Sequence, residues 1–173
     1  MNHRYLLLDA LKKEKFDSIL DVGCGYGQDL ALIKKKFPKV RIAGIDASHE
    51  RIVEAVEELG NIQLVVGHAS EMPFEDKSFD ISFTDAVLMM GGLERAILIL
   101  KEMIRVTRNK LFFIETHSNV PESGDKFVEY NVRNYQEILT ELGLRNIEFT
   151  KITKEVWNGY PWEFWGYLIE ATI

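Results

Sequence analysis

The chain has 173 residues, of which 46% are hydrophobic, and carries a formal net charge of -6 with a pI of about 5.3. This length and hydrophobic content predict one domain, residues 1–173, and the acidic balance argues against a broad nucleic-acid-binding surface. The single cysteine, Cys24, allows no internal disulfide and no metal-ligand pair, so we expect no metal site and a reducing compartment such as the cytoplasm.

The amino-terminal stretch, residues 1–16, predicts an amphipathic helix, because Leu7, Leu8 and Leu11 recur at helical spacing. Charges interrupt this stretch too early for a secretory signal, and no apolar run in the chain reaches the roughly 18 residues that span a bilayer. We therefore expect a soluble, unprocessed protein without a membrane partner. The helix could cover a ligand with Tyr5 at its edge, or it could simply pack on the sheet.

Short apolar runs and longer helical stretches alternate along the rest of the chain. Helix-terminating and capping residues support several boundaries, since Pro38 ends one helix and Ser48 and Gly60 suit the two ends of the next. The predicted helices after the first are 30–37, 48–59, 93–107 and 135–142. The predicted strands are 18–22, 40–46, 61–67, 78–87, 110–116, 144–153 and 163–173.

This alternation predicts an α/β fold, in which crossover helices cover both faces of a parallel sheet. The final two strands follow one another with a short connection, which favours antiparallel pairing. We therefore expect a single Rossmann-like domain with a seven-stranded, mostly parallel sheet, an antiparallel C-terminal strand and helices on both faces. Ligands of such sheets bind beyond the carboxyl ends of the strands.

Three glycines stand at alternate positions directly after the first predicted strand, in the stretch "LDVGCGYGQDL". Gly23, Gly25 and Gly27 lack the Cβ atom that would block a tight turn or the close approach of a ligand. Alternatively, the three glycines only turn the chain and let the helix pack closely on the strand. A second feature favours a nucleotide: Asp46 ends the second strand, where a carboxylate can accept hydrogen bonds from ribose hydroxyls. The same carboxylate also suits the start of a helix.

The spacing of the glycines bears on the kind of nucleotide. Dinucleotide-binding turns favour G-x-G-x-x-G, whereas this chain has G-x-G-x-G preceded by Asp21. An acidic side chain at the turn repels a pyrophosphate and attracts a ligand that carries ammonium or sulfonium charge. The pattern therefore favours S-adenosylmethionine.

Several motifs resemble the class I S-adenosylmethionine-dependent methyltransferases. "ILDVGCGYGQDL" is similar to their first motif and "AGIDAS" to their second. "GHASEMPFEDKSFDISFTDAVLMM" is similar to the stretch that enters their fourth strand, and "LERAILILKEMIRVTRNKLFFIE" to the helix and strand that follow. The resemblance implies a cofactor-binding core over 18–115 and acceptor-side elements over 116–173.

The resemblance also implies which residues bind S-adenosylmethionine. Asp21 and the three glycines would contact its methionine portion, Asp46 its ribose, and Ala47 its adenine, while residues 84–86 would face the sulfonium and the acceptor. The candidate cofactor-binding residues are Asp21, Gly23, Gly25, Gly27, Asp46, Ala47, His68, Ala69, Thr84 and Asp85.

Some positions depart from the family pattern. His68 stands where relatives often have an aspartate for the adenine amino group; its ring could accept that bond or stack, or the backbone alone could read adenine. Met89 and Met90 replace histidines, and "TRNK" replaces the usual Pro-Gly-Gly turn before the fifth strand. A general base is optional in methyl transfer; Glu115 and His117 are candidates, or they cap the strand end and hydrogen-bond loop backbone.

The sequence thus predicts an enzyme, a methyltransferase that moves a methyl group by in-line displacement to an unidentified acceptor, most simply a small molecule. Two alternatives stay open. A non-catalytic S-adenosylmethionine-binding accessory or sensor protein would keep Asp21, the glycines and Asp46. A nucleotide-dependent oxidoreductase would use the same fold with another cofactor. No pattern indicates an oligomeric state.

Overall fold

The structure, a computed structural model, describes residues 3–119 and 130–173. Its helices are α1 (Arg4–Leu11), α2 (Gln28–Lys36), α3 (His49–Leu59), α4 (Leu93–Val106), α5 (Tyr135–Glu141) and α6 (Trp162–Trp165). Its strands are β1 (Ser18–Val22), β2 (Arg41–Asp46), β3 (Gln63–Val66), β4 (Phe79–Asp85), β5 (Thr107–Thr116), β6 (Arg145–Lys151) and β7 (Gly166–Thr172). Residues 1 and 2 of the predicted first helix lie outside the described part.

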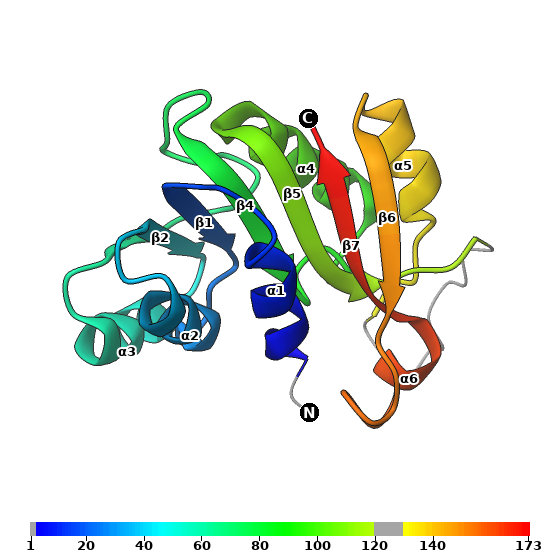
Figure 1. Ribbon diagram of the computed structural model, residues 1–173. Coiled ribbons are helices and arrows are strands. Elements are labelled where there is room, and N and C mark those ends of the chain that lie inside the picture. Colours follow the sequence, from blue (N-terminus) through cyan, green and yellow to red (C-terminus); the bar gives the residue numbers. More distant parts are fainter. Residues whose placement is uncertain (1–2, 120–129) are drawn as a thin grey trace.

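The strands form one sheet in the order β3-β2-β1-β4-β5-β7-β6 (Figure 1). The pairs among β1 to β5 are parallel, whereas β7 lies antiparallel between β5 and β6. The predicted seven-stranded, mostly parallel sheet with an antiparallel C-terminal strand is therefore confirmed. The chain moves outward from β1 to β3 on one side and from β4 onward on the other, so the boundary between β1 and β4 is the topological switch point at which such sheets bind ligands.

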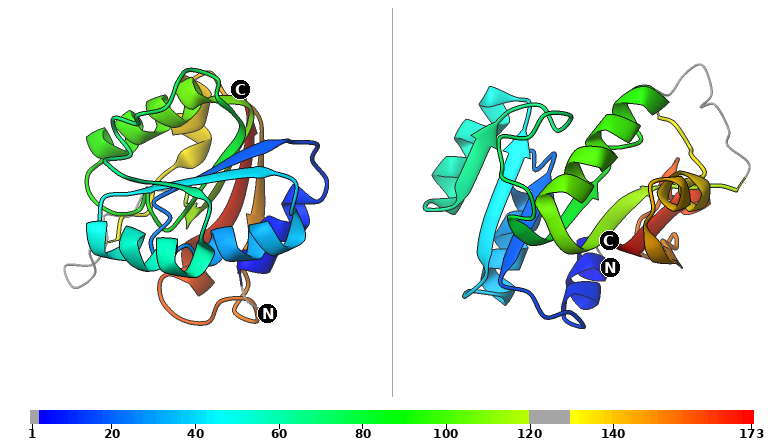
Figure 2. Two further views of the ribbon diagram at one scale, coloured as in Figure 1. Left: turned by 90° about the vertical axis from the view of Figure 1, so that its left-hand side faces the viewer. Right: turned by 90° about the horizontal axis from the view of Figure 1, so that it is seen from above.

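Helices cover both faces of the sheet, and each face has its own hydrophobic core. Helices α1, α2 and α3 pack with Ile19 of β1 on one face, whereas α4 and α5 pack with Leu20 and Val22 on the other. Figure 2 shows α1 and α4 on opposite sides of the sheet. Because side chains alternate along β1, neighbouring residues enter different cores. Burial of each aliphatic side chain contributes about 1.5–3 kcal/mol to the free energy of folding.

The boundary between α4 and β5 differs from the sequence prediction. No turn separates α4 from the fifth strand: β5 begins at Thr107, whose buried hydroxyl bonds to that of Ser82 at 2.7 Å and whose backbone pairs with Phe79. A register shift after Phe79 accommodates the stretch that replaces the family's turn. The burial of Thr107 and its pairing with β4 thus extend the strand where a turn is usual.

The predicted last strand, 163–173, begins later because α6 occupies its first residues. Trp162 is buried and stacks on Trp157, with ring centroids 3.9 Å apart, so this turn of helix adds a large aromatic side chain to the core. Strand β7 then starts at Gly166, where a Cβ atom would lie 2.6 Å from the carbonyl oxygen of Trp162. The close contact with α6 therefore requires glycine at the junction.

The first helix is shorter than predicted. It ends at Leu11, the last of its buried leucines, and the charged residues 12–15 continue as a turn because they have no apolar face to bury. Among the described residues, no helix is long and apolar enough to cross a membrane.

Candidate functional site

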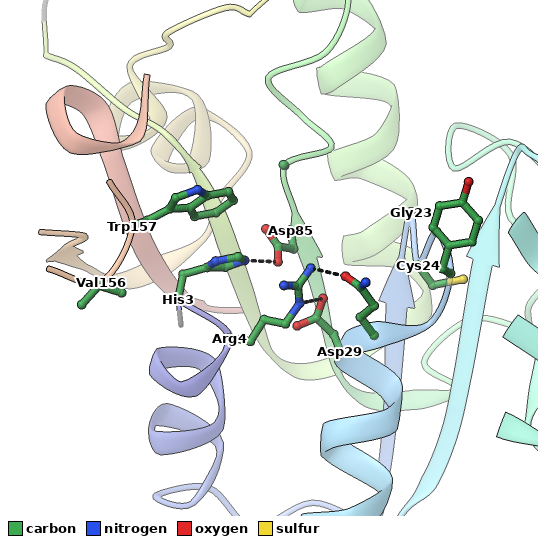
Figure 3. Close-up of a pocket in the computed structure, with 12 residues that line it drawn as sticks. His3, Arg4, Gly23, Cys24, Asp29, Asp85, Val156 and Trp157 are labelled. Atoms are coloured by element: carbon green, nitrogen blue, oxygen red, sulfur yellow. Dashed lines mark hydrogen bonds and ion pairs between the residues drawn. The ribbon is translucent and has the colours of Figure 1, made fainter. Parts of the chain in front are cut away.

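Two adjoining cavities lie at the carboxyl ends of β1, β2 and β4. The first has a volume of about 520 Å³ and the second about 290 Å³, and both are lined by Gly23, Asp85 and Ala86. They therefore form two halves of one cleft at the switch point of the sheet. Figure 3 shows the first cavity, with Asp85 at its centre.

The glycine turn between β1 and α2 forms one wall of the cleft. Its three glycines have positive φ angles of 82°, 52° and 75°, which other residues rarely adopt. The amides of Gly23 and Cys24 both donate to the carbonyl of Ile45, at 2.8 and 3.0 Å, and so bind the turn to β2.

The three glycines serve different purposes. A Cβ atom on Gly23 would lie 2.4 Å from Val87, and one on Gly27 would lie 2.5 Å from Leu59. The packing of these neighbouring side chains therefore favours glycine at both positions. A Cβ atom on Gly25 would meet no atom within 4 Å. Gly25 lines the first cavity, and the open space beside it is where a ligand can approach the backbone closely.

Asp46 connects the end of β2 to the glycine turn. Its Oδ2 accepts a hydrogen bond from the amide of Gly25 at 2.9 Å, and its Oδ1 accepts one from the amide of Ser48 at 2.8 Å. The residue is 9% exposed and lines the second cavity. Each carboxylate oxygen can accept a further hydrogen bond, so Asp46 has capacity left for ligand hydroxyls.

Carboxylates are concentrated around the first cavity. Burial raises the pKa of Asp21 well above its usual value, and the nearby charges of Asp29, Asp85 and Asp46 raise it further. Burial likewise raises the pKa of Asp29 to about 6, with Asp85 adding to the effect against the opposing charge of Arg4. Carboxylates packed this closely disfavour one another's ionised form and favour a cationic ligand.

Within the described residues, two buried oxygens of this cluster have no hydrogen-bond partner, namely Oδ2 of Asp21 and Oδ1 of Asp85. An unpartnered buried acceptor costs about 1–3 kcal/mol, more if it is charged. A positively charged group or an N–H donor in the cleft would remove that cost. These carboxylate oxygens thus fit a ligand that carries ammonium or sulfonium charge.

Four residues form a cover over the first cavity: His3, the N-cap of α1, Arg4, the first residue of α1, and Val156 and Trp157 of the β6–β7 connection. His3 Nε2 lies 2.8 Å from Asp85 Oδ2, and the His3 ring stacks on Trp157 with centroids 3.6 Å apart. Arg4 donates to Asp29 at 3.3 Å and to Gln28 at 2.8 Å. Figure 3 shows these ion pairs joining the cover to the base of the cleft.

Glu115, at the end of β5, organises the loop that follows β4. It is fully buried, and it accepts hydrogen bonds at 2.8–2.9 Å from the hydroxyl of Thr84 and from the amides of Val87, Leu88 and Met89. Burial raises its pKa to about 7 although these bonds act in the opposite direction. Val87 lines the second cavity, so Glu115 supports the cleft from behind.

His117 lies in a separate buried environment. Its Nδ1 accepts a hydrogen bond from the amide of Tyr135 at 3.2 Å, and its ring lies 4.3 Å from that of Phe149. Burial lowers its pKa. Neither His117 nor Glu115 lines the two cavities, and their contacts are those of residues that bind loop backbone at a strand end.

Most of the predicted cofactor-binding residues come together in the cleft. Those that line its cavities are Gly23, Gly25, Asp46, Ala47, His68, Ala69 and Asp85. The side chain of Thr84 is fully buried against Glu115, Asp21 is buried in β1, and Gly27 is the N-cap of α2. These three support the cleft without lining it.

The sequence allowed the first helix either to cover a ligand, with Tyr5 at its edge, or simply to pack on the sheet. The start of this helix does border the cavity, but Tyr5 is 48% exposed and His3 and Arg4 line the cavity instead. The missed contacts were identifiable in principle, because two basic side chains begin a helix in a chain whose cleft is acidic. Trp157 also lines the cavity, and both His3 and Trp162 stack on it.

Fold and cleft together define an α/β protein that binds a nucleotide-bearing, positively charged ligand. Residues 19–110 match the family described as methyltransferase domain. A demethylmenaquinone methyltransferase of Chlorobaculum tepidum is 39% identical over 71 residues, which cover 41% of this chain and 29% of that protein. The O-methyltransferase resE of Aspergillus sclerotiorum is 30% identical over 157 residues, covering 80% and 58%. The chain therefore belongs to the class I S-adenosylmethionine-dependent methyltransferase family.

A solved structure agrees in fold. The crystal structure of the 1,6-didemethyltoxoflavin-N1-methyltransferase of Burkholderia thailandensis, with bound 1,6-didemethyltoxoflavin and S-adenosylhomocysteine, matches with a TM-score of 0.76 at 15% identity, covering 98% of this chain and 76% of that one. The matches to the curated relatives named above and to three others span 26–58% of those proteins' own lengths.

Proposed function

We propose that the chain is a methyltransferase that uses S-adenosylmethionine to methylate a small-molecule acceptor. The observation that carries this proposal is the acidic cleft at the switch point, where the glycine turn, Asp46 and the unpartnered oxygen of Asp85 lie together. Family membership supports the reaction class, and the arrangement of charges supports the cofactor.

Each half of the cleft suits one part of the cofactor. Asp46 has free acceptor capacity for the ribose hydroxyls, and Ala47, His68 and Ala69 line the second cavity, which suits adenine. Gly25 offers open space beside the backbone, and the carboxylate of Asp21 suits the positive charge of the methionine portion. S-adenosylmethionine, when bound, supplies a methyl group on a sulfonium ion.

The residues of the chain orient and enclose this group. The cover borders the first cavity, and its ion pairs fix the start of α1 to the cleft. Alignment of the acceptor is the main requirement for in-line transfer. We propose that Glu115 acts by positioning residues 87–89 through its hydrogen bonds, and that His117 positions the start of α5.

The size of the cleft supports a small acceptor. The first cavity, of about 520 Å³, must hold the methionine portion of the cofactor as well as the acceptor. The cover lies over this cavity. These dimensions favour a compact molecule over a macromolecular side chain presented on a broad surface.

Calorimetry tests the cofactor. S-adenosylhomocysteine should bind and raise the melting temperature, because a ligand selective for the folded state stabilises it. NAD in the same assay is the control, and binding of NAD without S-adenosylhomocysteine would favour an oxidoreductase instead.

Methyl transfer from isotope-labelled S-adenosylmethionine to a pool of small molecules then separates an enzyme from an accessory or sensor protein. We expect labelled product with the wild-type chain. Cofactor binding without any transferred label across such pools would favour the sensor.

A further inference from the structure

Asp85 occupies the point where the two halves of the cleft meet. One of its oxygens, Oδ2, is bound to His3, whereas Oδ1 has no hydrogen-bond partner in the part of the chain that the structure describes, although the side chain is only 10% exposed. Figure 3 shows the Asp85 side chain extending into the first cavity between the cover and the glycine turn. This oxygen is an acceptor that the folded chain itself leaves unused.

The electrostatic surroundings of Asp85 limit what can bind there. In the described part of the first cavity's lining, only His3 and Arg4 can carry positive charge, and they lie within hydrogen-bond distance of Asp85 and Asp29. Asp21 lies close enough to both carboxylates to be affected by their charge. A carboxylate or phenolate acceptor would therefore enter a negative electrostatic field, and the two basic side chains that could neutralise it are already paired with Asp85 and Asp29.

We propose that the methyl acceptor is a nitrogen nucleophile, an amine that donates an N–H to Oδ1 of Asp85. This inference rests on the proposed methyltransferase function and adds the chemical class of the acceptor. An N–H donor satisfies the unpartnered oxygen, and a nitrogen that gains positive charge during the reaction is stabilised by the same carboxylate.

The transfer balances without an added reactant. An aliphatic amine is an ammonium ion at neutral pH, so it first releases one proton to solvent, and the lone pair of the neutral amine then forms the new bond to the methyl carbon. The electrons of the broken carbon–sulfur bond stay on sulfur, which becomes a neutral thioether. The positive charge passes to nitrogen, and the product leaves as an N-methylammonium ion. An adjacent carboxylate such as Asp85 stabilises the charge on nitrogen as it develops.

His3 serves in this arrangement as a positioning residue. Its bond to Oδ2 fixes the orientation of the Asp85 carboxylate, and stacking on Trp157 fixes the imidazole in turn. The free oxygen of Asp85 is thereby held toward the ligand. His3 acts through Asp85 and need not touch the acceptor.

Binding to the chain saturated with S-adenosylhomocysteine tests the acceptor class without requiring turnover. The probes are benzylamine, benzyl alcohol and phenylacetate, which are similar in size and differ in the group presented to Asp85. We expect benzylamine to bind at least about 10-fold more tightly than the other two, since a hydrogen bond to a charged group has that effect. Asp85→Asn should abolish the preference and leave the affinity for S-adenosylhomocysteine within about threefold.

Asp80→Asn is the matched control, because Asp80 lies at the opposite end of β4 and binds Ser18 and Arg108. It should keep the amine preference, and melting curves show whether either variant is folded. His3→Gln should weaken the preference partly if His3 only orients the carboxylate.

Three results would overturn the inference. These are equal or absent binding of the amine by the wild-type chain, an unchanged preference in a folded Asp85→Asn variant, or a large loss of S-adenosylhomocysteine affinity in that variant. The last result would assign Asp85 to the ammonium group of the cofactor. Failure of the wild-type chain to bind S-adenosylhomocysteine would instead contradict the proposed function itself, so the two failures are distinguishable.

Discussion

The carboxylate of Asp46 is hydrogen-bonded to the backbone amide of Gly25, with 2.9 Å between Oδ2 and the nitrogen. The acidic residue at the end of β2 therefore holds the glycine turn in place before any ligand binds. Asp46 thus contributes in two ways: it orders the binding surface, and it keeps acceptor capacity for the ligand. Substitution of Asp46 should therefore affect both the stability of the chain and its affinity for the ligand.

Asp46→Ala should lower both stability and cofactor affinity. The amides of Gly25 and Ser48 lose their acceptor, so we expect the free energy of unfolding without ligand to fall by about 1–2 kcal/mol. Affinity for S-adenosylhomocysteine should fall about 10-fold or more. Asp46→Asn should be milder because an amide oxygen still accepts. Ser48→Ala, which removes the helix cap of α3, should cost stability alone, and unchanged affinity in both Asp46 variants would exclude Asp46 from the site.

Gly25→Ala and Gly143→Ala form a matched pair. Both glycines have positive φ, 52° and 83°, and a Cβ atom on either would meet nothing within 4 Å. Each substitution should therefore cost about 1–2 kcal/mol of stability through backbone strain. Only Gly25→Ala should also weaken S-adenosylhomocysteine binding in calorimetry, because only Gly25 lines the cleft. Equal affinities for the two variants would place the ligand away from the turn.

Glu115→Gln should change the pH dependence of stability. Burial raises the pKa of Glu115 from 4.5 to about 7, so the folded chain holds more protons than the unfolded chain between these values. The free energy of unfolding contributed by this group therefore falls as pH rises through that window. The variant should show a smaller fall, and it should lose about 1–3 kcal/mol overall because its amide faces N–H donors.

Glu102→Gln is the control for this measurement. The pKa of Glu102 is lowered, first by its hydrogen bond to Arg105, so its contribution has the opposite sign and is lost as pH falls. Denaturant unfolding curves from pH 5 to pH 8 on all three chains provide the comparison. An identical pH slope for wild type and Glu115→Gln would contradict the raised pKa.

Cofactor selectivity should depend on the ionisation of Asp29. Because burial raises its pKa to about 6, the carboxylate gains its charge as pH rises through that value. S-adenosylmethionine carries one more positive charge than S-adenosylhomocysteine, so the ratio of the two affinities should shift toward S-adenosylmethionine between pH 5 and pH 7. Asp29→Asn should flatten this trend, whereas Asp9→Asn on the outer face of α1 should preserve it. A trend that persists in Asp29→Asn would assign it to another group.

The sequence predicted the succession of strands along the chain, because each buried strand is a short apolar run that ends in a turn residue. It also predicted that Gly25 and Asp46 share a site, since both follow strands whose carboxyl ends lie at one edge of a parallel sheet. These inferences depend on local pattern and on general topology. They need no knowledge of side-chain contacts.

The cover could not be predicted in the same way. His3 contacts Asp85 across 82 residues of sequence, and an amphipathic helix shows which face it buries but not where its first turn lies. The turn of helix at α6 was also missed, because a run of aromatic residues has the composition of a strand and only the packing of Trp162 decides the outcome. Glu115 illustrates the same limit: its residue type fits a base, and only its burial and four bonds indicate a positioning contact.

The antiparallel insertion of β7 has a practical consequence. It brings residue 173 back to the start of β5, where the amide of residue 173 donates to the carbonyl of Asn109. This is the end of the parallel strands opposite the cleft. His3, by contrast, lies in the cover itself (Figure 3). An affinity tag, fluorophore or surface linkage attached after residue 173 would leave the cleft facing solution, whereas the same attachment before His3 would sit beside the entrance and disturb the measurements described above.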